Sequence, residues 1–142
     1  MIADGTHVRA LGGLPSSLND STLAPFFGPA GLRLEDWVGS SAYEDADQPT
    51  PSDTDRAAAL KDAEAYLVLY FAAPRINMVI ADSGIVTFKV DGTSTDQFTY
   101  LKPRDLETLR QGWLRDAVSA CGRYIIKAGV IIGVSPAVDE ET

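Results

Sequence analysis

Apolar residues recur every three or four positions between Ser52 and Pro74. The repeating positions are Ala57, Leu60, Ala63, Leu67 and Phe71. This spacing predicts a long helix with one buried face. From Ala65 to Ala73 the segment is apolar nearly all round, so we expect it to be buried on several sides or to meet another subunit. Thr50 or Ser52 can cap its start, and Pro74 is expected to end it because proline lacks a backbone N–H.

The period of the pattern changes after Pro74. The segments Ile76 to Ile80 and Ile85 to Val90 alternate in polarity and are rich in β-branched side chains, which is typical of strands. Between them, Asp82-Ser83-Gly84 suits a short turn with glycine in the left-handed conformation. The pattern therefore predicts a β-hairpin, at about residues 76–90, inserted between two helices.

A second long helix is predicted from Pro103 to Gly129. Proline is favourable in the first turn, and the early acidic residues Asp105 and Glu107 complement the helix dipole. The apolar positions that follow the helical period are Leu106, Leu109, Trp113, Ala117 and Tyr124. Gly112 and Gly122 weaken the helix by roughly 1 kcal/mol each relative to alanine. They either allow close approach of another helix or are mild local imperfections.

We expect the two long helices to pack against each other. The side chains predicted to meet between them are Leu60, Leu67, Phe71, Leu109, Trp113 and Ala117. Their matching helical spacing is the reason, since each set forms one apolar stripe on its own helix.

Shorter elements are predicted before the first long helix. Residues 1–16, with several glycines and a proline, are expected to form an irregular N-terminal arm. A short helix within 17–27 is expected to be broken by Gly28, Pro29 and Gly31, and a second one to end at Gly39.

The predicted fold is mainly α: two long helices plus short helices, an inserted β-hairpin, and extended N- and C-terminal arms. With 142 residues, the chain is expected to form a single domain, with a helical core at 17–129 and a C-terminal tail at 130–142.

Composition excludes several classes of protein. The net charge of −8 argues against a general nucleic-acid backbone binder, which needs clustered basic residues. The only cysteine, Cys121, excludes an intrachain disulfide. No apolar run approaches the roughly 20 residues of a membrane span, and no signal peptide is expected.

Residues that could support catalysis are few. His7 is the only histidine and lies in the predicted arm, where a solvated role is favoured, and Cys121 fits a small core residue. The acidic set Glu44, Asp45 and Asp47 lacks the spacing of a cation-binding loop, and no glycine-rich segment matches a phosphate loop. We expect no enzyme activity, no metal and no cofactor.

Four arginines recur on the second predicted helix: Arg104, Arg110, Arg115 and Arg123. Acidic residues are interleaved with them, so one interpretation is a mixed, solvated helix face. The other is a set of ion pairs between subunits. The aromatic side chains nearby fit core or interface anchors better than a ligand cage.

Three segments together resemble a known family. Trp37-Val-Gly-Ser-Ser-Ala-Tyr-Glu44 is similar to the helix, glycine and aromatic turn that open small connector proteins of tailed bacteriophages. Ala63 to Phe71 resembles their first long helix, and Phe98-Thr-Tyr100 running into Pro103 to Ile126 resembles their last. The segment from Leu32 to Gly129 as a whole resembles head-completion, or head–tail adaptor, proteins, which form rings beneath the portal.

The resemblance implies a structural virion protein of the neck, present in the host cytoplasm during assembly. It implies a homo-oligomeric ring, commonly a dodecamer, through which packaged DNA passes, without sequence-specific nucleic-acid binding. It further implies contact with the portal protein and with the next neck or tail component. In such adaptors the C-terminal segment often docks onto the portal, and the matching apolar residues here are Val130, Ile131, Ile132 and Val134.

Two other interpretations stay open. The chain could be a different phage ring, such as a neck or tail-terminator protein, or a small enzyme or ligand-binding domain with no recognisable motif. Self-association discriminates best between them, because a small enzyme would bury its apolar helix internally and need no partner.

Overall fold

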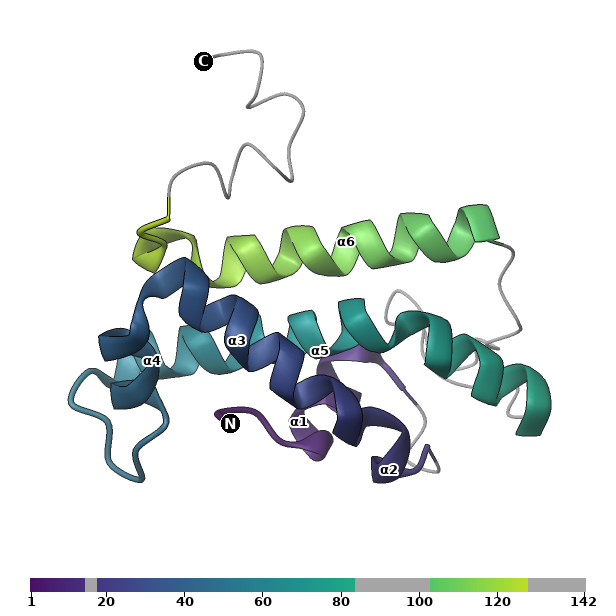
Figure 1. Ribbon diagram of the computed structural model, residues 1–142, viewed down its shortest axis with the longest axis horizontal. Coiled ribbons are helices and arrows are strands. Elements are labelled where there is room, and N and C mark those ends of the chain that lie inside the picture. The colour runs from purple at the N-terminus through teal and green to yellow at the C-terminus, as the bar shows by residue number, and fades with distance from the viewer. Residues whose placement is uncertain (15–17, 84–102, 128–142) are drawn as a thin grey trace, which may run out of the picture.

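The computed structural model describes residues 1–14, 18–83 and 103–127, and these form an assembly of helices (Figure 1). Before the long helices come α1 (Gly5–Gly12), α2 (Asp20–Leu23), a 3₁₀ turn η1 (Ala24–Phe26), α3 (Phe27–Val38) and α4 (Ser40–Ala46). The long helices are α5 (Thr54–Ser83) and α6 (Pro103–Cys121), and a second 3₁₀ turn η2 (Gly122–Tyr124) follows. The prediction of two long helices plus short ones is confirmed.

Helix α5 is the centre of the fold. It is contacted by α1, α2, α3, α4 and α6, which explains why its sequence is apolar nearly all round. The fully buried side chains along it include Leu60, Ala63, Ala65, Leu67, Val68, Leu69 and Ala72. The chain itself therefore covers this segment. The helix is capped by Asp53, whose carboxylate accepts the Arg56 N–H at 3.0 Å, and not by Thr50 or Ser52 as predicted.

Pro74 lies inside α5 and does not end it. A proline in a helix removes the N–H that would bond the carbonyl four residues earlier, here that of Tyr70. In this fold the guanidinium of Arg110, on α6, donates its Nε–H to the Tyr70 carbonyl at 3.1 Å. The orphaned acceptor is thus satisfied by the neighbouring helix, and the helix continues through the proline to Ser83.

The predicted β-hairpin is wrong. Its first strand, Ile76 to Ile80, is helical and belongs to α5, where Ile76 is buried, and the described residues contain no β-strand. The physical reason is tertiary packing, because Ile76 continues the buried face of α5 beyond the proline. The second predicted strand, Ile85 to Val90, lies outside the described residues.

The predicted irregular N-terminal arm is also wrong. Residues 5–12 form α1, which begins after Asp4, whose carboxylate accepts the His7 N–H at 2.8 Å, and ends at Gly13 with φ of 65°. Ala3, Val8 and Leu14 are buried. A Cβ on Gly12 would lie 2.6 Å from Leu69 of α5. The glycine that suggested irregularity therefore lets α1 lie close against α5.

The short helices follow the sequence pattern in part. Asn19 caps α2, and α3 ends at Gly39, whose φ of 93° favours glycine. The predicted break at residues 28–31 is wrong, since α3 runs through it. Pro29 falls in the first turn of α3, where no N–H is needed.

Helix α6 runs antiparallel beside α5 (Figure 1). The prediction that it extends to Gly129 is wrong, because it ends at Cys121 and the backbone becomes extended at Ile125. The N–H groups of Ile126 and Lys127 then donate to the Trp37 carbonyl of α3 at 2.8 and 3.2 Å. These bonds direct the chain away from the helix axis towards α3.

The predicted contact between the two long helices is present. Of the six side chains, Leu60, Leu67, Trp113 and Ala117 are buried, while Phe71 and Leu109 are half-buried against the same core.

Candidate functional site

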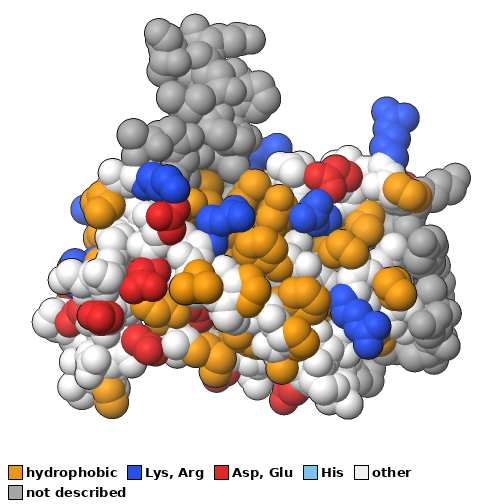
Figure 2. All heavy atoms as spheres, viewed as in Figure 1, with side chains coloured by type: hydrophobic (Ala, Val, Ile, Leu, Met, Phe, Trp, Pro, Cys, Tyr) orange, Lys and Arg blue, Asp and Glu red, His pale blue; other side chains and the backbone are white. Residues whose placement is uncertain are grey.

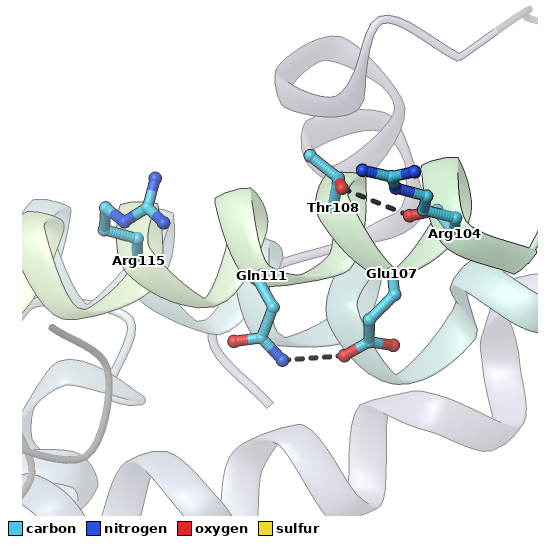
Figure 3. Close-up of a pocket in the computed structure, with 5 residues that line it drawn as sticks. All are labelled: Arg104, Glu107, Thr108, Gln111 and Arg115. Atoms are coloured by element: carbon cyan, nitrogen blue, oxygen red, sulfur yellow. Dashed lines mark hydrogen bonds between the residues drawn. The ribbon is translucent and has the colours of Figure 1, made fainter. Parts of the chain in front are cut away.

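The side of α6 that faces away from the core is the candidate functional site. The buried positions of α6 are Trp113, Ala117, Val118 and Cys121. On the side opposite Trp113, at helical spacings of four, seven and eleven residues, are Arg104, Thr108, Gln111 and Arg115. We call these four residues the outward face of α6. With Glu107 they line an open surface hollow (Figure 3).

One acidic residue beside the outward face is already engaged. The Glu107 carboxylate accepts the Gln111 amide at 2.8 Å and the Arg110 guanidinium at 2.7 Å. These two contacts hold the pKa of Glu107 below its ordinary value, with the Gln111 hydrogen bond the larger cause. In Figure 3, Glu107 and Gln111 extend from one edge of this face, below the helix in the view, and Arg104, Thr108 and Arg115 from its other edge, above the helix.

The structure divides the four predicted intersubunit arginines into two groups. Arg110 serves its own chain, since it donates to the Tyr70 carbonyl, pairs with Glu107 and stacks 4.3 Å from the centre of the Tyr70 ring. Arg123 lies in η2, 5.6 Å from the Tyr124 ring. Arg104, Arg115 and Arg123 are exposed and have no ion pair within the part of the chain that the structure describes. Of these three, Arg104 and Arg115 lie on the outward face of α6.

The two glycines of this region have no packing role within the described structure. A Cβ added to Gly112 or Gly122 would meet nothing within 4 Å. Neither glycine is therefore needed for a helix contact inside the chain.

A buried polar cluster at the other side of α5 was missed from the sequence. Glu64 is fully buried, and its Oε1 accepts the backbone N–H groups of Ile2 and Ala3, both at 2.8 Å. Its Oε2 accepts the Tyr43 hydroxyl at 2.5 Å. Burial, with the nearby Glu64 carboxylate, raises the pKa of Tyr43. The cluster fixes the start of the chain to α4 and α5.

A signal for this cluster exists in the sequence. Glu64 is the one charged residue between Ala63 and Ala73, within the most apolar part of the predicted helix. A carboxylate at such a position has to be hydrogen-bonded. The sequence does not identify the donors, because two of them are backbone groups more than 60 residues away.

The two residues first considered for catalysis both contact groups of their own chain. His7 Nε2 lies 2.7 Å from the Asp62 carboxylate and joins α1 to α5. Cys121 is buried, its Sγ donates to the Ala117 carbonyl at 3.3 Å, and burial raises its pKa to about 12. Within residues 1–14, 18–83 and 103–127 no group of three histidine, cysteine or carboxylate side chains is placed to hold a metal ion.

The predicted portal-binding residues Val130, Ile131, Ile132 and Val134 lie outside the described residues. Among the helices that are described, none is both long and apolar enough to cross a membrane. Comparisons of the chain with protein-family models, curated proteins and solved structures give no match.

Proposed function

We propose that this chain is a structural virion protein, a ring-forming head–tail adaptor that docks under the portal and joins it to the next neck or tail component. The observation that carries the proposal is the outward face of α6, where Arg104 and Arg115 are exposed without an ion pair in the described structure. Arginine is enriched among the residues that dominate binding at protein interfaces. The resemblance of residues 32–129 to phage adaptors agrees with this role.

Internal burial of α5 is also what a small enzyme or ligand-binding domain would show, so it does not separate the two proposals, but it leaves the α6 surface uncovered. The apolar part of α5 is covered by helices of the same chain. The core of the described part therefore forms without covering the outward face of α6. The protein has a net charge of −8, yet two unpaired cations stand on one helix face. A partner with exposed carboxylates would neutralise them.

Portal docking is assigned to the C-terminal residues Val130, Ile131, Ile132 and Val134. A short apolar segment of this kind can add to a strand edge of a partner, where main-chain hydrogen bonds give affinity and alternate side chains give fit. The competing possibility is that the segment packs against its own chain.

Deleting residues 130–142 tests the proposal. We expect the truncated chain to keep its helical circular dichroism spectrum and to fail to load onto portal-bearing heads. A chain ending at Val138 retains the apolar segment and loses only residues 139–142, three of which are acidic. It is the matched control and should load normally. Head retention of DNA and joining of tails are the functional readouts.

Two results would contradict parts of this proposal. If the chain without residues 130–142 folds and still loads, docking through the tail is wrong. If the full-length chain neither loads onto portal-bearing heads nor joins them to tails, the adaptor function itself is wrong. Light scattering after size exclusion, with and without the portal protein, measures the stoichiometry in each case.

A further inference from the structure

We propose that the outward face of α6 docks against the acidic end of a second copy of this chain, so that copies associate head to tail. The acidic end is the segment 35–55, which spans the end of α3, all of α4 and the start of α5. It contains seven acidic residues and no lysine, arginine or histidine. The inference rests on the proposed function and specifies the contact between neighbouring subunits.

The acidic end has carboxylates to offer a partner. Some are used within the chain, since Asp36 pairs with Lys127, Asp45 with Arg56, and Asp47 with the amino group of Met1. Glu44 on α4 and Asp55 in the first turn of α5 are exposed and have no ion pair with any described residue. These two carboxylates match the two unpaired arginines of the outward face in number and in exposure.

The two surfaces lie apart on the molecule. In Figure 1, α4 and the start of α5 are at the left, while α6 runs along the top and begins at the right. Figure 2 shows acidic side chains gathered over the left end, and along the top, where α6 lies, several basic side chains with an acidic group among them. Opposite charges on separate surfaces cannot pair within one molecule, but they can pair between successive copies.

Charge bears on the two ways in which copies can associate. If the outward face met its own equivalent across a two-fold axis, Arg104 and Arg115 could pair only with carboxylates of α6 itself, Asp105, Glu107 and Asp116, of which Glu107 is already engaged by Gln111 and Arg110. Contact between the outward face and the acidic end opposes unlike charges. Such a heterologous contact generates a ring when the rotation between copies closes.

Charge reversal tests the contact in the full-length chain. The first variant, Arg104→Glu with Arg115→Glu, makes both surfaces acidic, and the second, Glu44→Lys with Asp55→Lys, makes both basic. We expect each alone to weaken self-association about tenfold or more. The matched control, Arg75→Glu, changes an exposed arginine of α5 that belongs to neither surface and should associate like the unmodified chain.

Recombining the variants gives the decisive result. An equal mixture of the two should recover assemblies in which they alternate, and so should one chain carrying all four substitutions, because each restores unlike charges across every contact. Recovery by the mixture as two-chain species only, without recovery by the fourfold variant, would indicate the two-fold arrangement and overturn the inference. Circular dichroism establishes that each variant is folded, and light scattering at low and high salt measures the assembly.

The same variants separate this inference from the proposed function when they are also tested on portal-bearing heads. If the unmodified chain associates and the arginine variant associates equally well, the head-to-tail contact is wrong while the adaptor function is untouched. If the variants behave as expected and no chain loads onto heads, the adaptor function fails while the contact stands. A chain that stays monomeric both in solution and on heads overturns the contact.

Discussion

Helices α5 and α6 lie side by side but are covered very differently. Helix α5 is contacted by five other helices and buries a fully desolvated carboxylate, Glu64, whose two oxygens accept three hydrogen bonds. Helix α6 buries one side against α5 and exposes Arg104 and Arg115 on the other. The contrast shows that α5 is the centre of the core, while the outward face of α6 is exposed.

The largest expected effect is in the core around α5. Leu67 is fully buried, so Leu67→Ala should lower the free energy of unfolding by about 2–5 kcal/mol through lost burial and the cavity that remains. The matched control is Leu32→Ala on α3, where the side chain is 69% exposed, and it should change stability by no more than about 0.5 kcal/mol. Urea unfolding measures both. Equal losses would show that Leu67 does not belong to the core.

The second prediction compares a buried glutamate on α5 with an exposed one on α6. Glu64→Ala leaves the N–H groups of Ile2 and Ala3 and the Tyr43 hydroxyl without their acceptor, so we expect a loss of about 2–4 kcal/mol. Glu107→Ala on α6 should cost much less, because its ion pair is exposed. Hydrogen exchange should show loosened residues 1–14 in the first variant only. Unchanged protection there would contradict the role of Glu64.

The third prediction concerns the contact that joins the two helices. Arg110→Ala removes the donor to the Tyr70 carbonyl and should cost about 1–3 kcal/mol, whereas Arg115→Ala should have little effect. In a Pro74→Ala background the residue at 74 supplies its own N–H to that carbonyl, so the cost of Arg110→Ala should shrink. A double-mutant cycle measures this coupling. Full additivity would mean that Arg110 does not compensate for the proline.

The sequence predicted the features that depend on residues close together in the chain, and it failed where a feature depends on a residue far away in the chain. The helical spacing of Leu60, Leu67, Trp113 and Ala117 is a local signal, and it identified both long helices and their contact. The fate of Pro74 depended on Arg110, 36 residues further along the chain, so reading the proline as a helix end was wrong. The hairpin followed from the same error, because Ile76 was assigned to a strand once the helix had been ended too early.

The sequence also predicted only a part of the candidate site. The arginines of α6 were found from their spacing, but only the structure separates Arg110, which serves its own chain, from Arg104 and Arg115, which are exposed. The helix at residues 5–12 was missed because its glycines were taken as breakers. A Cβ on Gly12 would lie 2.6 Å from the Leu69 side chain, and such a close approach is invisible until two helices are placed together.

Two glycine-to-alanine changes, which include the smallest expected effect, should differ in sign between the two regions. Gly31 lies on α3 against α5, and a Cβ there would lie 2.7 Å from the Tyr43 hydroxyl and 3.3 Å from Glu64 Oε2. Gly31→Ala should therefore destabilise the chain by about 1–3 kcal/mol, since a methyl group must displace a hydrogen-bonded pair.

Gly112 lies inside α6, where a Cβ meets nothing within 4 Å. Gly112→Ala should raise stability by about 0.5–1 kcal/mol through helix propensity. Thermal unfolding of both variants measures the signs, and a stabilised Gly112→Ala variant with unchanged self-association would show that no neighbouring copy packs closely against that position. If the folded monomer instead loses stability on Gly112→Ala, α6 is covered at that position by its own chain, and a smaller part of the helix is left for a partner.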